Sequence, residues 1–244
     1  MTTKFEIQVI VEPRPLTGAQ NMDIDAGLLE TVCDDETRGF VRIYEWSTPT
    51  ITLGHFQKVD AVPDGPLALL PCVKRLTGGG AILHHQEITY SLAVPASHPF
   101  RGNPVQAYEK VHTAIIELMQ YLGVQSLMRA DQNPAHMDPA NQKPTSSSSS
   151  EPPTERQLPE KSEENFLCFL RSDPRDIVSN GMKIVGSAQR RRKGSILQHG
   201  SILLKKSPFA PNMEGICDLW PNFEPDVFHD KLAGAIAAAI AHPT

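Results

Sequence analysis

The sequence contains few cysteines and no paired cysteine motif. Its four cysteines are far apart along the chain, and no two of them form a Cys-x-x-Cys pair. This spacing argues against a zinc site and against a disulfide framework. The four thiols, at Cys33, Cys72, Cys168 and Cys217, therefore favour a reduced, cytoplasmic setting.

The sequence also lacks long hydrophobic runs and an excess of positive charge. KFEIQVIVEP is too short and too interrupted for a secretory signal, and AGAIAAAIA is too short to span a bilayer. The 23 Lys and Arg residues are outnumbered by 28 Asp and Glu, and the resulting net charge of -5 argues against a general nucleic-acid binder. We expect a protein that binds neither a membrane nor nucleic acid.

One internal segment has almost no apolar residues. Residues 132–164 instead carry a five-serine run and repeated prolines, a composition that cannot offset its own ordering entropy by burial. Because 244 residues suffice for one domain with an insertion, we expect a disordered insertion within a single domain of residues 5–244. A linker between two domains is the alternative.

On both sides of this segment, helical and strand-like spacings alternate. Helices are expected at residues 19–33, 103–123 and 223–241, the second of them capped by Asn103 with Pro104 in its first turn. Strand-like runs occupy residues 40–46, 51–56, 67–73, 81–94, 166–170, 176–186 and 195–204, and the run 81–94 is split at HQE. We predict an α+β fold with helices packed on a mostly antiparallel or mixed sheet.

The dipeptide at 180–181, Asn-Gly, predicts a tight hairpin, because both positions of such a turn need positive φ. In the return strand, strict alternation places Lys183 on the same face as Val185 and opposite Ile184. The small residues at 186–188 make the backbone slim enough to leave room for a ligand. An ordinary solvent-facing lysine is the alternative.

Cys168 lies in the apolar stretch FLCFL, where alternation places it on one face with Phe166 and Leu170. A cysteine in such a place is most often part of the core. A role as nucleophile would need a nearby cation to favour the thiolate, and Lys183 is a candidate for that cation.

Three consecutive glycines, Gly78, Gly79 and Gly80, precede a strand. Because they carry no Cβ, their backbone can approach a ligand closely, although a simple turn is the alternative. Their spacing matches neither the dinucleotide fingerprint nor the phosphate loop.

Histidines and a basic run complete the candidate residues. His84 and His85 end the strand after the glycines, and His199 lies in ILQHGSILL. Since they lack an i, i+4 spacing or a carboxylate partner, we expect them to line a site and to bind no metal. The run from Arg190 to Lys193 is either a solvated face or a docking surface for an acidic partner.

Four stretches in order resemble one family: NMDIDAGLLE, YEWSTPTITLGHFQ, KRLTGGGAILHHQEITYSLAVP and GMKIVGSAQRRRKGSILQHGSILL. Together they are similar to the catalytic domain of lipoate-protein ligase A and the octanoyltransferases, which share a superfamily with the biotin ligases. The match runs from about residue 5 to residue 230, and the insertion interrupts it. The cysteine-dependent LipM-type octanoyltransferases look closest, because the Cys-Phe pair, the hairpin, KIVGSAQ and LQHGS occur in their order. The resemblance implies a biotin/lipoate ligase-like fold.

The resemblance also implies an activity. Cys168 would take an octanoyl group from octanoyl-acyl carrier protein as a thioester and pass it to a lysine of a lipoyl domain, without ATP or metal. Lys183, as an ammonium, would favour the thiolate and donate a hydrogen bond to the developing oxyanion. The expected acceptors are the lipoyl domains of 2-oxoacid dehydrogenase complexes and the glycine cleavage H protein, and the expected oligomeric state is a monomer. The expected substrate-binding residues are Arg75, Gly78, Gly79, Gly80, His84, Gly186, Ser187, Ala188, Gln189 and His199, and the expected docking residues are Arg190, Arg191, Arg192 and Lys193.

Two departures from the family pattern bear on the alternatives. His85 stands where the family more often has aspartate, and the chain ends too soon for the accessory C-terminal domain of many lipoate ligases. The main alternative is an ATP- and Mg-dependent lipoate-protein ligase, which would bind a lipoyl-adenylate and need no cysteine. An amidotransferase between lipoyl domains and a non-catalytic lipoyl-domain adaptor are the others. A biotin ligase is disfavoured because the Gly-Arg-Gly-Arg signature is absent.

Overall fold

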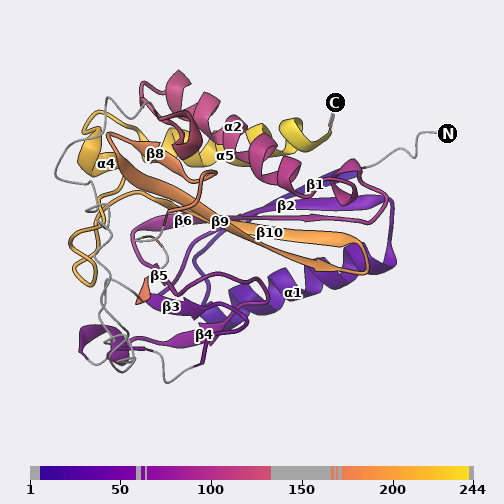
Figure 1. Ribbon diagram of the computed structural model, residues 1–244, viewed down its shortest axis with the longest axis horizontal. Coiled ribbons are helices and arrows are strands. Elements are labelled where there is room, and N and C mark those ends of the chain that lie inside the picture. Colours follow the sequence, from indigo (N-terminus) through magenta and orange to yellow (C-terminus); the bar gives the residue numbers. More distant parts are fainter. Residues whose placement is uncertain are drawn as a thin grey trace, which may run out of the picture.

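The computed structural model describes residues 6–58, 62–63, 65–132, 166–167, 169 and 172–241. Within them the chain forms two sheets and three long helices, α1 (Gly18–Asp34), α2 (Val105–Tyr121) and α5 (Pro225–Ala241). Helices α2 and α5 cover one face of the larger sheet, and α1 and the smaller sheet lie on its other face (Figure 1). The expected insertion lies outside the described residues, apart from Gln132.

The larger sheet has the strand order β1-β2-β6-β10-β9-β8-β7. Its first pair, β1 with β2, is parallel, and the other neighbouring strands run antiparallel. The α+β class with a mixed sheet is therefore confirmed. The strands are β1 (Glu6–Val11), β2 (Arg38–Tyr44), β6 (Glu87–Val94), β7 (Leu127–Met128), β8 (Ile177–Ser179), β9 (Met182–Arg192) and β10 (Ser195–Leu203).

The smaller sheet has the order β4-β3-β5, with β3 parallel to β4 and antiparallel to β5. Its strands are β3 (Thr50–Leu53), β4 (Cys72–Lys74) and β5 (Ile82–His84). Short helices connect the main elements: η2 (Pro66–Leu69), η3 (Pro99–Arg101), η4 (Arg129–Asp131) and α4 (Ile216–Leu219). No helix among the described residues is both long enough and apolar enough to cross a membrane.

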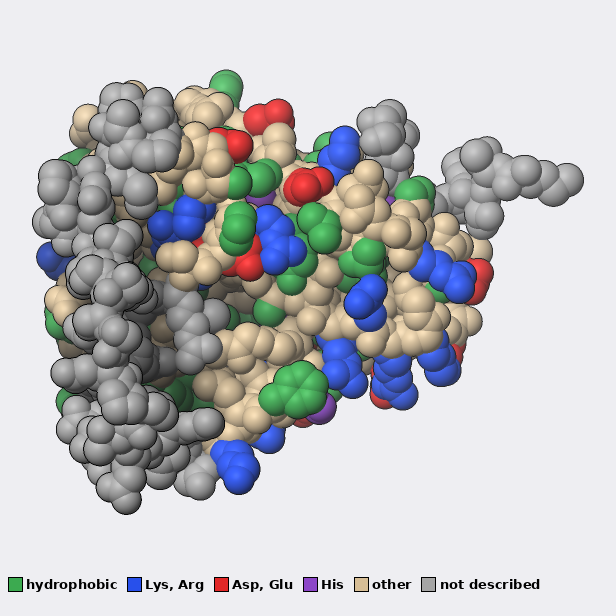
Figure 2. All heavy atoms as spheres, viewed as in Figure 1, with side chains coloured by type: hydrophobic (Ala, Val, Ile, Leu, Met, Phe, Trp, Pro, Cys, Tyr) green, Lys and Arg blue, Asp and Glu red, His purple; other side chains and the backbone are tan. Residues whose placement is uncertain are grey.

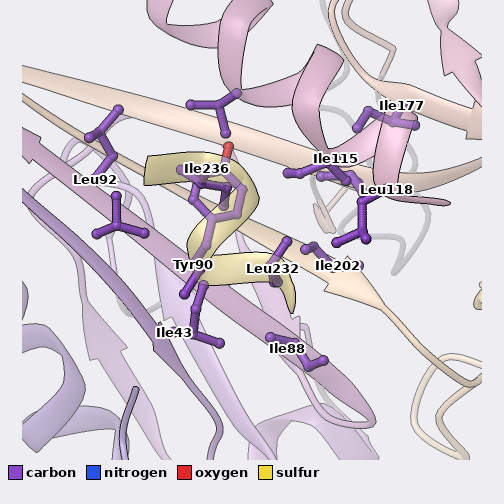
Figure 3. Packing of buried hydrophobic residues seen from close by; sticks show 14 of the residues in the cluster. Ile43, Ile88, Tyr90, Leu92, Ile115, Leu118, Ile177, Ile202, Leu232 and Ile236 are labelled. Atoms are coloured by element: carbon purple, nitrogen blue, oxygen red, sulfur yellow. The ribbon is translucent and has the colours of Figure 1, made fainter. Parts of the chain in front are cut away.

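The main core lies between the larger sheet and the helices α2 and α5. Figure 3 shows the sheet residues Ile43, Tyr90 and Ile202 packing toward Ile115 of α2 and Ile236 of α5. Burying each such side chain contributes about 1.5–3 kcal/mol, so this face holds the sheet in place. The opposite face of the same strands is consequently free to carry polar residues.

Two tight turns organise the meander β8-β9-β10. Asn180 and Gly181 have φ of 48° and 79°, which confirms the hairpin that their sequence predicts. Lys193 and Gly194, with φ of 50° and 89°, form the second turn, between β9 and β10. The two turns place β9 in the sheet between β8 and β10.

The three expected helices are confirmed, with small differences at their ends. α1 starts at a capping box in which Thr17 and Gln20 exchange hydrogen bonds. α2 has Pro104 rather than Asn103 at its cap position, because the helix begins one residue later than the sequence suggests. Gly123 follows the end of α2 with φ of 84°, as a helix-ending glycine does.

The strand predictions were less accurate. Residues 66–69 form a 3-10 helix, since Pro66 favours a helical first turn, and only the end of the expected run 67–73 is a strand. The two strands within 81–94 are confirmed, but they belong to different sheets. β1 and β7 were not expected at all. In the stretch 166–170, the described residues contribute one isolated bridge, from Leu167 to Ala81, instead of a regular strand.

Candidate functional site

The two faces of the larger sheet differ at its centre: one carries polar side chains and the other packs into the main core. On β6 and β10 the side chains of Thr89, His199 and Ser201 point toward α1 and the smaller sheet, where they line a small cavity with Thr52, Arg75 and His84. Tyr90 belongs to the core on the other side, beneath α2. We therefore describe the α1 face as the candidate site and treat the α2 face as its support.

One series of hydrogen bonds crosses the site from α1 to the loop of Gly78, Gly79 and Gly80, which we call the glycine loop. The buried carboxylate of Asp25 lies 3.2 Å from His199 Nδ1, and His199 Nε2 lies 2.6 Å from Thr77 Oγ1. Burial raises the pKa of Asp25, but the hydrogen bond and charge of His199, with the charge of Arg42, outweigh burial and hold it below its ordinary value. Asp25 is thus an anion that orients the imidazole of His199.

A second series of hydrogen bonds, again from a carboxylate through an imidazole to a threonine hydroxyl, starts from β6. Glu87 Oε1 lies 2.9 Å from His84 Nδ1, and His84 Nε2 lies 2.9 Å from Thr52 Oγ1. Trp46 stacks on the imidazole of His84, with ring centroids 3.8 Å apart. Burial lowers the pKa of His84, so its imidazole is neutral near pH 7. His84 and His199 are therefore brought into one cavity, as lining residues.

Both series of hydrogen bonds end at Arg75. Its Nε donates to Thr77 Oγ1, and one terminal nitrogen donates to the carbonyl and the hydroxyl of Thr52. The other terminal nitrogen donates to the carbonyls of Gly78 and Gly80, at 2.9 and 2.6 Å. Arg75 is thus buried beneath the glycine loop and holds its carbonyls in place.

The glycine loop also needs its lack of side chains. A Cβ on Gly54 would overlap the carbonyl of Gly79, and Gly79 itself has φ of 92°. The loop therefore packs backbone against backbone, which only glycine permits at this distance.

Lys183 lies at the edge of this face, next to Asp176. Its Nζ is 2.9 Å from Asp176 Oδ1, and the two side chains are only 7% and 5% exposed. The aromatic ring of Phe169 lies 5.0 Å from the same nitrogen. Burial raises the pKa of Asp176, and the ammonium of Lys183 opposes that rise. The solvent-facing alternative for Lys183 is therefore wrong.

A register shift directs Lys183 to this face. Val178 pairs with Lys183 but Ile177 pairs with Val185, so β9 has one extra residue there. Strict alternation fails as a result, because Ile184 and Val185 both belong to the core beneath α2. A Cβ on Gly186 would come within 2.6 Å of Lys183 Cε, so the lysine side chain runs across Gly186.

The predicted nucleophile Cys168 lies outside the described residues, but its two neighbours are described. Leu167 bridges to Ala81, the residue that follows the glycine loop, and Phe169 contacts Lys183 as above. Both neighbours are buried in the core of the smaller sheet.

Ser187 and Gln189 have side chains on the opposite face. Ser187 Oγ lies 2.6 Å from Tyr90 Oη and 2.6 Å from His112 Nε2 of α2. Gln189 donates to Gln198, which in turn donates to Tyr90 Oη. These two predicted substrate-binding residues are therefore not brought together with His84 and His199, whereas Ala188 pairs directly with His199.

Of the four basic residues, the three arginines end β9 and Lys193 begins the turn that follows. Arg192 and Lys193 form ion pairs with Glu30 and Asp34 of α1, at 3.1 and 3.4 Å. Figure 2 shows Lys and Arg side chains gathered where the β9–β10 hairpin lies beside α1. His85, the departure from the family pattern, lies 2.8 Å from Ser207 Oγ, away from this basic end.

The model of the lipoyl protein ligase A/B catalytic domain matches residues 17–208. The chain belongs to this family. Among curated relatives, the octanoyltransferase LipM of Geobacillus kaustophilus is 36% identical over 191 residues, which cover 76% of this chain and 61% of the relative. The octanoyltransferase LipM of Anoxybacillus flavithermus is 33% identical over 204 residues, covering 82% of this chain and 66% of the relative. The chain thus spans a little under two thirds of the length of these relatives.

The fold of this lipoyl ligase family member also matches solved structures. A putative lipoate protein ligase from T. acidophilum with bound lipoic acid aligns with a TM-score of 0.63 and 14% identity, covering 97% of this chain and 86% of that one. At such an identity the likeness shows the fold alone. The predicted biotin/lipoate ligase-like fold is confirmed.

Sequence reasoning missed several residues of this lipoyl ligase domain, namely the hydrogen-bond partners of His199 and His84 (Asp25, Thr77, Glu87 and Thr52), and also Asp176 and His112. Asp176 contacts Lys183, and His112 supports Ser187 from α2. The Asn-Gly hairpin alone could have pointed to Asp176, because hairpin register places it within two pairs of Lys183. No local signal could have found His112, whose partners lie 63 and 75 positions away.

Proposed function

We propose that this protein is an octanoyltransferase that moves an octanoyl group from acyl carrier protein to a lysine of a lipoyl domain. Cys168 is the proposed acyl acceptor, and Lys183 is the proposed stabiliser of the transition state. Support comes from the curated octanoyltransferase relatives and from the position of the residues flanking Cys168. The observation that carries most weight is that Phe169, the next residue, contacts Lys183.

In the first step, the thiolate of Cys168 attacks the thioester carbonyl of octanoyl-acyl carrier protein. A new carbon–sulfur bond forms, and the carrier's thiolate leaves. The ammonium of Lys183 donates a hydrogen bond to the carbonyl oxygen as negative charge develops there, a contribution of about 3 kcal/mol at comparable sites. One thioester replaces another, so this step is nearly balanced in free energy.

In the second step, the neutral amine of the acceptor lysine attacks the Cys168 thioester. The Cys168 thiolate leaves, the amine nitrogen loses a proton and a stable amide results. Because a thioester is exchanged for an amide, the reaction is downhill and needs neither ATP nor a metal ion. The cavity beside Ile82, His84 and His199 is the proposed start of the acyl-chain slot.

The partners follow from charge. Acyl carrier proteins and lipoyl domains tend to be acidic, and the basic end of β9 would orient them. Arg190 and Arg191 are proposed as the docking residues, because Arg192 and Lys193 already pair with α1. The acceptors would be lipoyl domains of 2-oxoacid dehydrogenase complexes and the glycine cleavage H protein, met in the cytoplasm by a monomer.

Intact mass spectrometry tests the proposal. We expect the protein to gain one octanoyl group after incubation with octanoyl-acyl carrier protein in the absence of ATP, and hydroxylamine to remove it. Cys168→Ala should abolish the adduct. Cys72→Ala is the matched control, because burial raises the pKa of that thiol and it should not compete as a nucleophile.

An adduct that persists in Cys168→Ala would contradict the cysteine mechanism. No adduct in the wild type, together with modification of a lipoyl domain only when ATP and free lipoate are supplied, would show an ATP-dependent ligase instead.

A further inference from the structure

The ion pair between Lys183 and Asp176 is buried, and its geometry is fixed from both sides. Asp176 is the last residue before β8, and its Oδ1 accepts from Lys183 Nζ. Its Oδ2 accepts from the backbone N–H of Asp173 at 2.8 Å and lies 3.9 Å from Arg129 Nε. One carboxylate oxygen therefore faces the lysine, while the other is held by the preceding loop.

The loop that carries Asp176 is itself clamped. His112 of α2 lies 2.6 Å from the carbonyl of Arg175 through Nδ1, and its Nε2 meets Ser187 of β9. Arg175 forms a two-bonded ion pair with Asp173, and its guanidinium stacks over the ring of Tyr108 at 4.6 Å. The loop, α2 and β9 are thus joined at the point where Asp176 meets Lys183.

The path of the lysine side chain is equally constrained. The extra residue in β9 turns Lys183 toward the site face, and Gly186 leaves the space that its side chain crosses. Lys183 therefore reaches Asp176 along one route, with the ring of Phe169 on its other side. A buried ammonium is stabilised by an opposite charge at hydrogen-bond distance, and Asp176 supplies that charge.

We propose that Asp176 is a positioning residue that keeps Lys183 charged and aimed at the reacting carbonyl. This inference rests on the proposed transferase function, in which Lys183 must act as a hydrogen-bond donor. Asp176 does not touch the substrate in this mechanism and acts only through the lysine. Without it, the ammonium would lose the buried counter-charge that lies 2.9 Å from its Nζ.

The test compares the pH dependence of acyl-enzyme formation in the wild type, Asp176→Asn and Asp176→Glu. Asp176→Asn should lower the rate about 10-fold or more, which is less than the roughly 100- to 1,000-fold typical of losing an oxyanion donor itself. On the alkaline side of the pH profile, the rate of Asp176→Asn should begin to fall at a lower pH than the rate of the wild type. Asp176→Glu keeps the charge and should recover part of the rate and the original alkaline limb.

Asp131→Asn is the matched control, since it removes an exposed acid of η4 that belongs neither to the ion pair nor to the clamp around it. It should keep the wild-type shape of the pH profile, and thermal melts would show which variants remain folded. If Asp176→Asn does not fold, Asp176→Glu decides: it should keep the alkaline limb of the wild type at a reduced rate, and an alkaline limb displaced in spite of the retained carboxylate would overturn the proposal.

A second readout separates this inference from the proposed function. Reductive methylation of Lys183, followed by mass spectrometry, reports how much of the neutral amine is present and needs no acyl donor. Faster methylation in Asp176→Asn than in Asp131→Asn would support the role of Asp176 even if the wild type formed no acyl-enzyme. Equal methylation, with equal pH profiles, would overturn it.

Discussion

At the scale of single residues, the structure leaves no room for a side chain at Gly186. The lysine side chain crosses the place where any other residue would have a Cβ. Gly200 is constrained in a similar way, since a Cβ there would overlap Ser187 Oγ and the ring of Tyr90. The small residues of KIVGSAQ and LQHGS thus make room for protein side chains as much as for a ligand.

Gly186→Ala should displace Lys183 from Asp176 and sharply reduce acyl-enzyme formation. The new Cβ would lie 2.6 Å from Lys183 Cε, closer than van der Waals contact allows, so the flexible lysine has to move. Single-turnover measurements with octanoyl-acyl carrier protein would report the loss, which we expect to be about 10-fold or more.

Gly27→Ala on α1 is the control, because no atom lies within 4 Å of a Cβ at that position. It should leave the rate unchanged and raise the free energy of unfolding by about 0.5–1 kcal/mol. Wild-type rates in Gly186→Ala would mean that the position of Lys183 does not matter for the reaction.

At the scale of elements, one buried histidine joins α2, β9 and the loop before β8. His112 donates to or accepts from a partner on each side at 2.6 Å, and burial lowers its pKa from 6.5 to about 4. The imidazole is therefore neutral in the folded protein, with Nδ1–H donating to the carbonyl of Arg175. Ser187 can then donate to Nε2 and accept from Tyr90.

This lowered pKa predicts a loss of stability in acid. Above pH 6.5 His112 is neutral in both states, and its contribution is fully present. As pH falls from 6.5 toward 4, the unfolded chain binds the proton first, so the free energy of unfolding falls by up to about 3 kcal/mol. Urea denaturation at pH 7 and at pH 4.5 should show a smaller difference for His112→Asn than for the wild type.

Asn keeps a donor near the position of Nδ1 but does not titrate, so it isolates the protonation effect from the loss of the contact. His229→Asn, on a partly exposed position of α5, should leave the pH dependence as in the wild type. An identical pH dependence in His112→Asn would show that this histidine does not account for the acid sensitivity.

At the scale of the whole molecule, charge is unevenly distributed. The net charge is -5, yet four consecutive basic residues extend from the β9–β10 hairpin beside α1. The exposed pairs with Glu30 and Asp34 contribute little stability, about 0–1 kcal/mol each. The proposed role of this basic surface is to orient an acidic partner.

Replacing Arg190 and Arg191 by Ser should slow acyl transfer from octanoyl-acyl carrier protein about 10-fold at low salt. The difference should shrink as ionic strength rises, because salt screens the attraction that steers the partners together. The measurement is the second-order rate of acyl-enzyme formation across a salt series.

The double variant Lys110→Ser/Lys231→Ser is the control with the same change in net charge. These lysines lie on α2 and α5, which cover the other face of the larger sheet. An equal loss in both double variants would mean that net charge, and not the basic surface, sets the rate.

Much of the fold follows from local sequence signals. Helix α2 has an apolar stripe and a terminating glycine, and the Asn180-Gly181 turn needs positive φ at both positions, so each is specified by its own residues. The family motifs likewise lie in short contiguous stretches. β1 and β7 escaped prediction because each is a strand only by virtue of a partner, β2 or β8, that is distant in sequence.

The sequence by itself determined the fold class, the three long helices, the hairpin after β8 and the candidates Lys183, His84 and His199. Only the tertiary structure decided which face each residue uses: one extra residue in β9 turned Lys183 toward the site and left Ser187 facing His112. The physical reason is that side-chain direction in a strand depends on register, and register depends on pairing with other strands. The role of His112 on α2 also emerges only from the tertiary structure, since its hydrogen bonds join residues that no local pattern links.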